Sequence, residues 1–272
     1  MTSVIVPAHN EEGRVGRCLT ALTSGAAEGE FEIIVVPNGC TDRTVEESRT
    51  FEPAVKVIEL DVASKVAALN AGDDVATSYP RVYVDADVVV TVQDLRLVVA
   101  ALDDADVHLA APQRYWIVEG RPWIVRSYLR LLRQLPQVRS SLMGGGVLAV
   151  SEQGRARFGR FPDVIGDDLF LESRFTAAEK RAVLGAQSRV DMPATVRGLV
   201  ARRTRVALAN LEAPSAEVSH SRWSSLGEAL RDRPELAFDL PAFLGVTAIA
   251  QLAARQRLRR GDRSWIRDYS SR

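Results

Sequence analysis

Residues 3–12 read Ser-Val-Ile-Val-Pro-Ala-His-Asn-Glu-Glu, an apolar run that turns polar within a few positions. Ser3–Pro7 has the length and composition of a buried strand, and the polar residues after it mark the strand's end. The same pattern, an apolar run with a polar end, recurs along the first half of the chain. It predicts further strands at Glu32–Val36, Val55–Leu60, Arg81–Val84 and Val107–Ala111.

Segments with helical spacing separate these strands. Residues 12–25 place Val15, Cys18, Leu19 and Leu22 on one helical face. Further helices are predicted at Thr41–Arg49, at Ser64–Gly72 with Ser at its start and Gly at its stop, and at Val92–Asp104. Strands that alternate with helices of this length indicate βαβ units. We therefore expect an α/β, Rossmann-like fold with a mostly parallel central sheet flanked by helices.

The second half is less regular. An amphipathic segment spans Tyr115–Leu135, and a strand is predicted at Val147–Val150 after three glycines. Helices are predicted at Leu169–Ala178, Thr195–Arg205 and Phe243–Arg259, so the C-terminal region should be helical. We find no repeat or linker and predict one domain over residues 1–272.

Composition favours a globular intracellular protein. Apolar residues make up 46% and charged residues 26% of the chain. Two cysteines, Cys18 and Cys40, are too few for a disulfide framework or a zinc cluster. We find no basic-then-apolar leader, and the longest apolar stretch, Leu240–Ala254, is shorter than a membrane span. We therefore expect a cytoplasmic protein.

The net charge of zero is unevenly shared. Residues 1–110 carry 8 Lys+Arg and 19 Asp+Glu, a net charge of −11, whereas residues 111–272 carry 27 and 16, a net charge of +11. Two solvated surfaces that differ by chance would explain the split. Alternatively, the second half faces phosphate groups of a substrate or of a lipid surface.

Polar residues collect where a ligand should bind. In open α/β sheets, ligands bind beyond the carboxyl ends of the strands. Three of the predicted strands are followed by the polar segments 7–11, 37–39 and 85–87. No Gly-x-Gly-x-x-Gly follows the first strand, which is evidence against a dinucleotide-binding fold.

The pair Asp85 and Asp87 is the strongest candidate metal site. It directly follows the apolar residues 82–84, so a buried strand delivers both carboxylates to the ligand edge. Neighbouring carboxylates repel unless a cation bridges them, and oxygen ligands suit Mg²⁺ or Mn²⁺. A helix cap is the alternative. A second pair, Asp104 and Asp106, lies in an acidic loop and is interpreted as solvated surface.

An ordered set of motifs resembles the family 2 glycosyltransferases of the A-type fold. They spread over roughly residues 1–172 and are specific as a set. These are residues 4–12 (VIVPAHNEE), 35–42 (VVPNGCTD), 65–72 (KVAALNAG), 84–87 (VDAD), 144–146 (GGG) and 166–169 (GDDL).

The resemblance implies an inverting, nucleotide-diphospho-sugar-dependent transferase and a role for each matching position. The donor nucleotide would be bound by Pro7, Ala8, Asn10, Glu11, Asn38, Lys65, Asn70, Asp85 and Ala86. Asp87 would ligate the metal, with Asp85 near the ribose or the metal. Gly144, Gly145 and Gly146 would lie against the donor sugar, where absent side chains permit close approach. Residues 1–111 would be the nucleotide-binding half, 112–240 the acceptor and catalytic half, and 241–272 a C-terminal helical extension.

Two positions depart from the family pattern. Pro37-Asn38-Gly39-Cys40 stands where the family commonly has Asp-Asp-Gly-Ser, and Asn38 can both accept and donate hydrogen bonds. Uridine is the favoured base. Asp167-Asp168 stands where the family has Glu-Asp, and the resemblance makes Asp168 the general base.

Asp168 also has a chemical argument in its favour. Displacement at the anomeric carbon needs a base near the acceptor hydroxyl, and a metal on the diphosphate stabilises the leaving group. One metal site and one separate carboxylate are sufficient for inversion. The alternative is that Asp167 or Asp168 caps the following helix.

Other side chains remain open between functional and structural interpretations. His220 is a candidate late metal ligand or a surface-loop histidine. Arg202 and Arg203 neutralise a diphosphate or form an exposed basic helix face. Three aromatic residues would stack on a sugar acceptor, touch lipid or pack an amphipathic helix: Trp116, Trp123 and Tyr128.

We expect three partners and no nucleic acid. They are a nucleotide diphosphate sugar, a small-molecule or polyprenyl- or lipid-linked acceptor, and a divalent metal, Mn²⁺ or Mg²⁺. The basic second half and the amphipathic segments Tyr115–Leu135 and Leu240–Arg260 predict peripheral contact with the inner membrane surface. Rival functions are a retaining transferase of the same fold, a sugar-phosphate nucleotidyltransferase and a catalytically silent nucleotide-binding protein.

Overall fold

The computed structural model describes residues 1–163, 166–212 and 217–260, except for the side chains of residues 212–224. Contacts group the chain into two compact units. The first contains Met1–Trp116, Leu142–Asp163 and Asp167–Val190. The second contains Ile117–Ser141 and the residues from Asp191 onward, together with the short segment 164–166. Each unit is described separately below.

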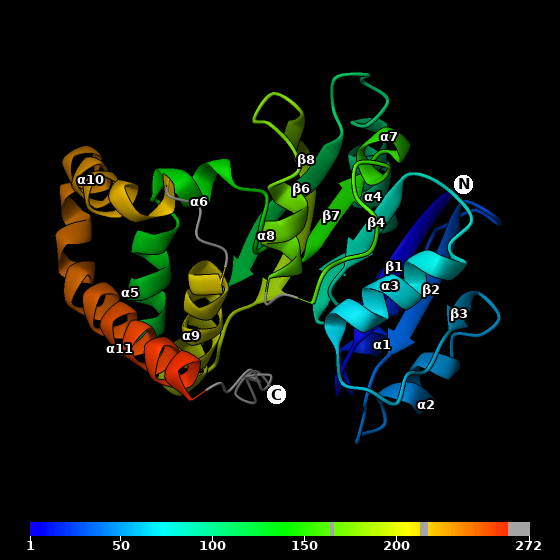
Figure 1. The fold of residues 1–272 in the computed structure, drawn as a ribbon, viewed down its shortest axis with the longest axis horizontal. Helices are drawn as coiled ribbons and strands as arrows, with labels where there is room; N and C mark the ends of the chain where they lie inside the picture. Colours follow the sequence, from blue (N-terminus) through cyan, green and yellow to red (C-terminus); the bar gives the residue numbers. More distant parts are fainter. Residues whose placement is uncertain (164–165, 213–216, 261–272) are drawn as a thin grey trace. The chain divides into compact units, whose positions relative to one another are not determined.

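A parallel half-sheet forms one side of the first unit (Figure 1). Its strands are β1 (Thr2–Ala8), β2 (Phe31–Pro37), β3 (Val55–Val57) and β4 (Arg81–Val84), in the spatial order β3-β2-β1-β4. Almost every residue of β1 and β4 is buried on both faces, as expected for parallel strands covered by helices. The predicted βαβ arrangement is confirmed here.

Beyond β4 the sheet becomes antiparallel. β7 (Val147–Val150) pairs with β4 and with β6 (Leu109–Ile117), and β8 (Lys180–Asp191) pairs with β5 (Val88–Val90). The full order is β3-β2-β1-β4-β7-β6-β8-β5. The α/β fold class is confirmed, and the sheet is mixed rather than parallel throughout.

Most helices of the first unit overlap predicted ones, but the helix at Asp167–Glu172 ends well before the predicted Ala178, and the helix at Glu152–Arg155 was not predicted. The helices of this unit are α1 (Val15–Thr23), α2 (Thr44–Arg49), α3 (Lys65–Val75), α4 (Val92–Ala100), α7 (Glu152–Arg155) and α8 (Asp167–Glu172). Ser64 caps α3, since its hydroxyl accepts from the Ala67 N–H at 3.1 Å. The predicted stop at Gly72 is wrong, because α3 continues to Val75 and a Cβ at Gly72 would lie 2.5 Å from Ile5. That glycine allows α3 to pack closely on β1.

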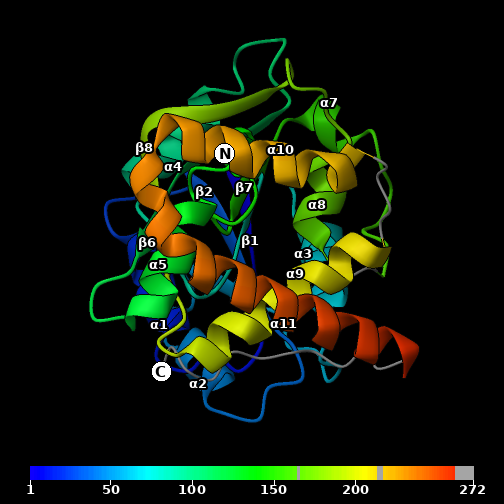
Figure 2. The same ribbon diagram turned by 90° about the vertical axis from the view of Figure 1, so that its left-hand side faces the viewer.

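The second unit is helical over its described residues. It contains α5 (Trp123–Leu132), α6 (Pro136–Ser140), α9 (Val196–Glu212), α10 (Glu217–Asp232), the 3₁₀ helix η1 (Pro234–Asp239) and α11 (Leu240–Arg259). Figure 2 shows α11 crossing α5 and α9, against which it packs. The residues Ala242, Val246, Ala250 and Ala254 are buried, so small side chains let the helices approach.

The expectation that no segment is long enough to span a membrane is wrong on length. Pro234–Arg259 forms a helical segment of 26 residues that is apolar enough to cross a bilayer. Within its most apolar stretch of 18 residues, 22% is buried inside the protein. One such helix is weak evidence of a span, because helices of soluble proteins pass the same test.

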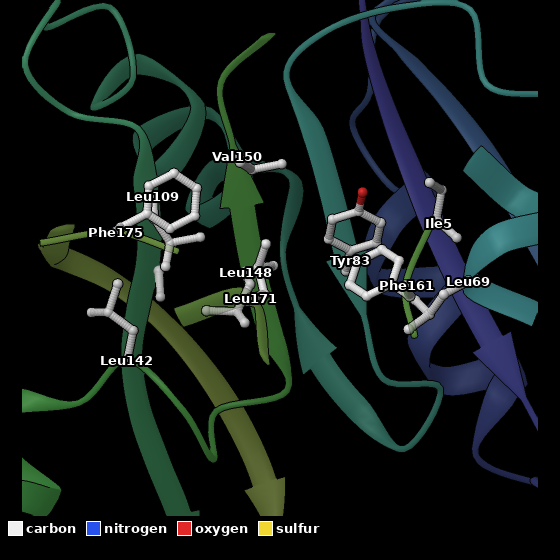
Figure 3. Packing of buried hydrophobic residues seen from close by; sticks show 11 residues of the cluster. Ile5, Leu69, Tyr83, Leu109, Leu142, Leu148, Val150, Phe161, Leu171 and Phe175 are labelled. Carbon is white, nitrogen blue, oxygen red and sulfur yellow. The ribbon is translucent and has the colours of Figure 1, made fainter. Parts of the chain in front are cut away.

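Large apolar side chains on one face of the sheet pack the core of the first unit (Figure 3). Tyr83 of β4 and Phe161 meet edge to face with ring centroids 5.2 Å apart. Leu109 of β6, Leu148 of β7 and Leu171 of α8 join the same cluster. This packing ties α8 to the strands, which fixes the position of the acidic residues at its start.

Candidate active site

The loops after β1 and β2 are held together by side-chain hydrogen bonds. Asn10 adopts a left-handed backbone with φ of 55°, and its Oδ1 accepts from the Thr41 N–H at 2.6 Å and the Asp42 N–H at 3.2 Å. Asp42 in turn accepts from the Glu12 N–H at 3.3 Å. The motif residues Asn10 and Asp42 therefore shape the two loops at the carboxyl edge of the sheet.

The orientation of the Asn38 side chain is fixed by two carbonyl groups. Its Nδ2 donates to the Ala8 carbonyl at 2.9 Å and to the Val36 carbonyl at 3.2 Å. Because both neighbours are acceptors, only the amide nitrogen can face them. Its Oδ1 is buried and has no hydrogen-bond partner among the described residues. Pro7 and Ala8, also predicted in the nucleotide site, are buried at the end of β1, and Glu11 is partly exposed in the loop after it.

The segment Asp85–Asp87 follows β4 and lies against the loop of residues 144–146, the glycine loop. The Asp85 N–H donates to the Gly146 carbonyl at 2.8 Å, and Ala86 between the two acids is buried. Gly144 and Gly146 have φ of 79° and 65°, so both need the left-handed region. A Cβ at Gly146 would lie 2.5 Å from Val88 and 3.1 Å from the Asp85 carboxylate. Glycine therefore lets this loop lie directly on Asp85.

Lys65 connects this segment with the second acidic pair. Its Nζ lies 2.7 Å from Asp85 Oδ1 and 2.9 Å from Asp167 Oδ2, and the lysine side chain is 22% exposed. Lys65 is the first residue of α3, and Asp167 and Asp168 are the first two of α8. The sequence predicted Lys65 beside the nucleoside, and the structure places its ammonium between two carboxylates.

The pKa of the Asp168 carboxyl group is shifted toward neutral pH. Burial and the charge of Asp167 raise its pKa from 3.8 to about 6, while the Lys65 ammonium partly opposes the shift. Its Oδ1 accepts the Leu169 N–H at 2.9 Å. Burial opposes the charge of Lys65, but Asp167 and Asp85 more than compensate and raise the pKa of the lysine. At neutral pH the site therefore holds an ionised Asp168 carboxylate near the Lys65 ammonium.

The local charge balance favours a bound cation. Four carboxylates, Asp85, Asp87, Asp167 and Asp168, lie at or near these loops, and Lys65 is the cation that contacts Asp85 and Asp167 in the described ion pairs. Burial raises the pKa of the Cys18 thiol, and the negative charges of Asp87 and Asp85 raise it further. No group of three His, Cys, Asp or Glu forms a metal cage among the described residues. A metal held by one or two carboxylates plus substrate phosphates fits this arrangement.

Asn70 and His220 are two of the predicted ligand-binding residues for which the described part of the structure gives no contact with the candidate site. Asn70 is buried, and its amide donates to the Phe161 carbonyl at 3.0 Å and accepts the Phe161 N–H at 2.8 Å. Its described hydrogen bonds therefore anchor the segment before α8, and a role toward a nucleoside stays a prediction. His220 belongs to α10, but its side chain lies outside the described residues.

The aromatic candidates separate into packed and exposed residues. Trp116 is buried, and its Nε1–H donates to the Gly144 carbonyl at 3.4 Å. Tyr128 stacks on Phe243 with centroids 5.0 Å apart, and Arg203 lies over its ring at 5.7 Å. Trp123 is 61% exposed. Arg202 contacts Met192 Sδ at 3.8 Å. Tyr128 therefore packs its helix, as one alternative expected.

Arg114 of β6 was not identified from the sequence. Its guanidinium donates to the Met143 carbonyl beside the glycine loop, and it lies 5.9 Å from the Trp116 ring centroid. Burial lowers its pKa, opposed by the charge of Glu172. An arginine in a long strand carries no motif, so only the pairing of β6 and β7 shows that it reaches this loop.

The fold and the site together define a glycosyltransferase of the A-type fold. The parallel half-sheet ends in polar loops, an Asp-x-Asp segment follows β4, and a second acidic pair begins α8. The chain belongs to glycosyl transferase family 2, whose sequence profile matches residues 3–160.

A curated relative supports this assignment over part of the chain. Glycosyltransferase AglE of Haloferax volcanii is 32% identical over 90 residues, which cover 31% of this chain and 30% of AglE. The match therefore spans less than a third of that relative.

Two solved structures share the fold. The mannosyltransferase PcManGT of Pyrobaculum calidifontis, in complex with GDP-Man and Mn²⁺, has a TM-score of 0.65 at 21% identity, covering 96% of this chain and 79% of PcManGT. Glucosyl-3-phosphoglycerate synthase of Mycobacterium tuberculosis, in complex with Mn²⁺, UDP-Glc and glycerol 3-phosphate, has a TM-score of 0.50 at 20% identity, covering 70% of this chain and 69% of the other. At these identities the likeness establishes the fold.

Proposed function

We propose that this glycosyltransferase moves a sugar from a nucleotide diphosphate sugar, with UDP-sugars favoured, to an acceptor hydroxyl with inversion. The observation that carries the proposal is the Lys65 bridge, 2.7 Å from Asp85 and 2.9 Å from Asp167. It joins the strand-end acids, which suit the diphosphate side, to the acidic pair that contains the base. This contact supports a single site that holds both the proposed metal ligands and the proposed base.

Asp168 is the proposed general base. A base works best when its pKa lies near the working pH, and a pKa of about 6 leaves Asp168 ionised at neutral pH yet able to take a proton. Removing the acceptor proton makes the oxygen a stronger nucleophile toward the anomeric carbon. Asp167, held at 2.9 Å from the Lys65 ammonium, positions the pair through its ion pair.

Asp87, with Asp85 beside it, would hold the divalent metal. When bound, Mn²⁺ or Mg²⁺ supplies positive charge that stabilises a departing diphosphate. Both fold neighbours were determined with Mn²⁺ and a nucleotide sugar, which supports the same class of cofactor here. Asp87 is the principal proposed ligand, as the family resemblance implies, and the neighbouring Ala86 is buried just after β4.

Asn38 is proposed to read the base by accepting a hydrogen bond. Its amide nitrogen is occupied by Ala8 and Val36, and the Oδ1 acceptor remains. A ring N–H, as in uracil or guanine, would complement that oxygen, whereas cytosine and adenine carry an acceptor at the corresponding ring nitrogen and could donate only from the exocyclic amine. The two fold neighbours bind GDP-Man and UDP-Glc, which are both of the accepted class.

A thermal-shift screen tests the donor. UDP-, GDP-, CDP- and ADP-sugars are compared with and without Mn²⁺, since a ligand that binds the native state raises the melting temperature. We expect a uridine or guanosine donor to stabilise the protein most and only with the metal. Equal shifts with all four, or none with any, would refute the donor assignment.

The stereochemical outcome is tested separately. Once a donor is found, ¹H NMR of the freshly formed product gives the anomeric configuration before it equilibrates. Inversion is expected, and a retained configuration would show that Asp168 is not a base in a single displacement.

A further inference from the structure

The outer face of α11 is apolar over two of its turns and more. Leu244, Ala248, Ile249 and Leu252 are exposed, with Ile249 at 55% and Leu252 at 60%. Phe238 of the preceding η1 is 86% exposed. The opposite face, with Ala242 and Val246, is buried. A helix that is apolar on both its packed and its outer face indicates a second apolar environment beyond the protein core.

The exposed outer face of α11 becomes basic toward the C-terminal end of the helix. Arg255 and Arg259 follow Leu252 at helical spacing and are exposed, and Arg260 extends the basic end. Residues 240–260 contain no Asp or Glu. This combination of exposed apolar side chains and adjoining arginines is typical of a helix that lies in a membrane interface.

α5 contributes a second basic stripe to the same unit. Its exposed residues Trp123, Arg126, Arg130 and Arg133 recur at intervals of three or four, which puts them on one face. No acidic residue occurs between Glu119 and Glu152. Arg130 Nε lies 3.6 Å from Asp239 Oδ2, so this stripe lies next to the start of α11 and the exposed Phe238.

We propose that the surface formed by Trp123 and the exposed arginines of α5, Phe238 of η1 and the exposed residues of α11 docks the protein peripherally on an anionic lipid bilayer. The apolar stripe would enter the headgroup and acyl boundary, and the arginines would contact lipid phosphates. Charge complementarity favours a bilayer over a second copy of the chain, because a symmetric pairing would bring together two copies of the same arginine-rich surface. The proposal concerns a surface of the second unit and goes beyond the transfer chemistry.

Flotation of the full chain with lipid vesicles tests the proposal. Binding to phosphatidylglycerol/phosphatidylcholine vesicles is expected at low salt and should weaken at high salt, with little binding to pure phosphatidylcholine. Each arginine near an anionic surface contributes roughly fivefold in partitioning. A double change, Arg126→Gln with Arg133→Gln, is therefore expected to weaken binding about 25-fold. The control is Arg181→Gln with Arg189→Gln, two exposed arginines of β8.

The apolar contribution is tested by exposed-site changes that leave the packed face intact. Leu244→Gln, Ile249→Gln and Leu252→Gln together should weaken binding at least roughly tenfold, since each loses apolar area that the bilayer would cover. Leu184→Gln, at a position 79% exposed in β8, is the control and should bind like wild type. Circular dichroism and UDP binding check that each variant is folded.

Four outcomes would overturn the proposal. The first is absence of wild-type binding to anionic vesicles at low salt, and the second is equal binding by the variants. The third is a concentration-dependent dimer in analytical ultracentrifugation that the triple glutamine variant abolishes, which would assign the surface to a second copy. Vesicle-bound protein that resists alkaline carbonate extraction would instead indicate a spanning helix and contradict peripheral docking.

Discussion

Replacing Asp168 with Asn is expected to inactivate the enzyme and to stabilise its fold. In the native protein, burial and Asp167 raise the pKa of Asp168 from 3.8 to about 6. Holding the carboxylate ionised in the folded state at pH 7.5 therefore costs up to about 3 kcal/mol, because each pKa unit corresponds to about 1.4 kcal/mol. Asn is neutral, nearly the same size, and can still accept the Leu169 N–H through its own Oδ1.

The pH dependence gives the sign of the effect. The folded pKa lies above the unfolded value, so this group's contribution to wild-type stability is fully present below about pH 4 and is lost as the pH rises through about 6. The stability gain of Asp168→Asn should therefore be largest at pH 7.5 and vanish near pH 4. For a chain of this length about 3 kcal/mol corresponds to roughly 5 °C in melting temperature.

The assay pairs calorimetry of metal-free protein with a rate measurement. The rate is release of the nucleotide from the best donor with water as acceptor, which needs no knowledge of the natural acceptor. Loss of a general base should lower it about 10²- to 10⁴-fold. The wild-type rate at pH 5 should be about one tenth of its plateau, since a base with a pKa near 6 is then mostly protonated.

Asp163→Asn is the matched control, because Asp163 is an exposed carboxylate a few residues earlier in the chain. It should change neither melting temperature nor rate. An Asp168→Asn protein that melts at or below the wild-type temperature at pH 7.5 would refute the electrostatic reasoning. One that retains near-normal turnover would refute the assignment of the base.

Three further substitutions test the surroundings of the site. Lys65→Met should move the acidic limb of the pH–rate profile to higher pH, because the ammonium lowers the pKa of Asp168; an unmoved limb would contradict this. Gly146→Ala should destabilise the fold by about 1–3 kcal/mol and weaken donor binding, because the added Cβ would meet Val88 and Asp85. The control is Gly159→Ala, which should do neither, because no atom lies within 4 Å of the added Cβ. Asn70→Ala should lower the unfolding free energy by about 2–3 kcal/mol, because two hydrogen bonds to Phe161 are lost. A loss of UDP affinity with unchanged stability would instead favour a role of Asn70 in binding the nucleoside.

The parallel half of the fold could be predicted because its signals are local. Each strand of β1, β2 and β4 is an apolar run that ends in polar residues, and Ser64 marks the start of α3. Gly72 was misinterpreted because a glycine that permits close packing and one that stops a helix look the same in a sequence. Only the contact with Ile5 distinguishes them.

β8 and α10 are among the elements that were missed, because they lack a periodic signal. β8 is exposed along much of its length, so Lys180–Asp191 shows no clear alternation of apolar residues. α10 contains many serines and few apolar residues, so it does not resemble a packed helix. Their formation depends on tertiary partners, such as the pairing of β8 with β5, which no local pattern reveals.

The candidate site residues were proposed from motifs, but the contacts between them could not be. The sequence placed Asp85 and Asp168 in separate motifs some 80 positions apart, and nothing local shows that one lysine contacts both acidic pairs. That bridge follows from the position of α3 on β1 and of α8 on the core. Arg114 escaped notice for the same reason.

Equilibrium binding of UDP with and without Mn²⁺ tests the central claim most directly. We expect Mn²⁺ to strengthen UDP binding to the wild type and to Asp168→Asn, and to have little effect on Asp87→Asn, which lacks the proposed principal metal ligand. Asp106→Asn, in the exposed second Asp-x-Asp pair, should behave like wild type. UDP binding that is equally tight in all four proteins, with and without the metal, would contradict a metal-assisted donor site at the end of β4.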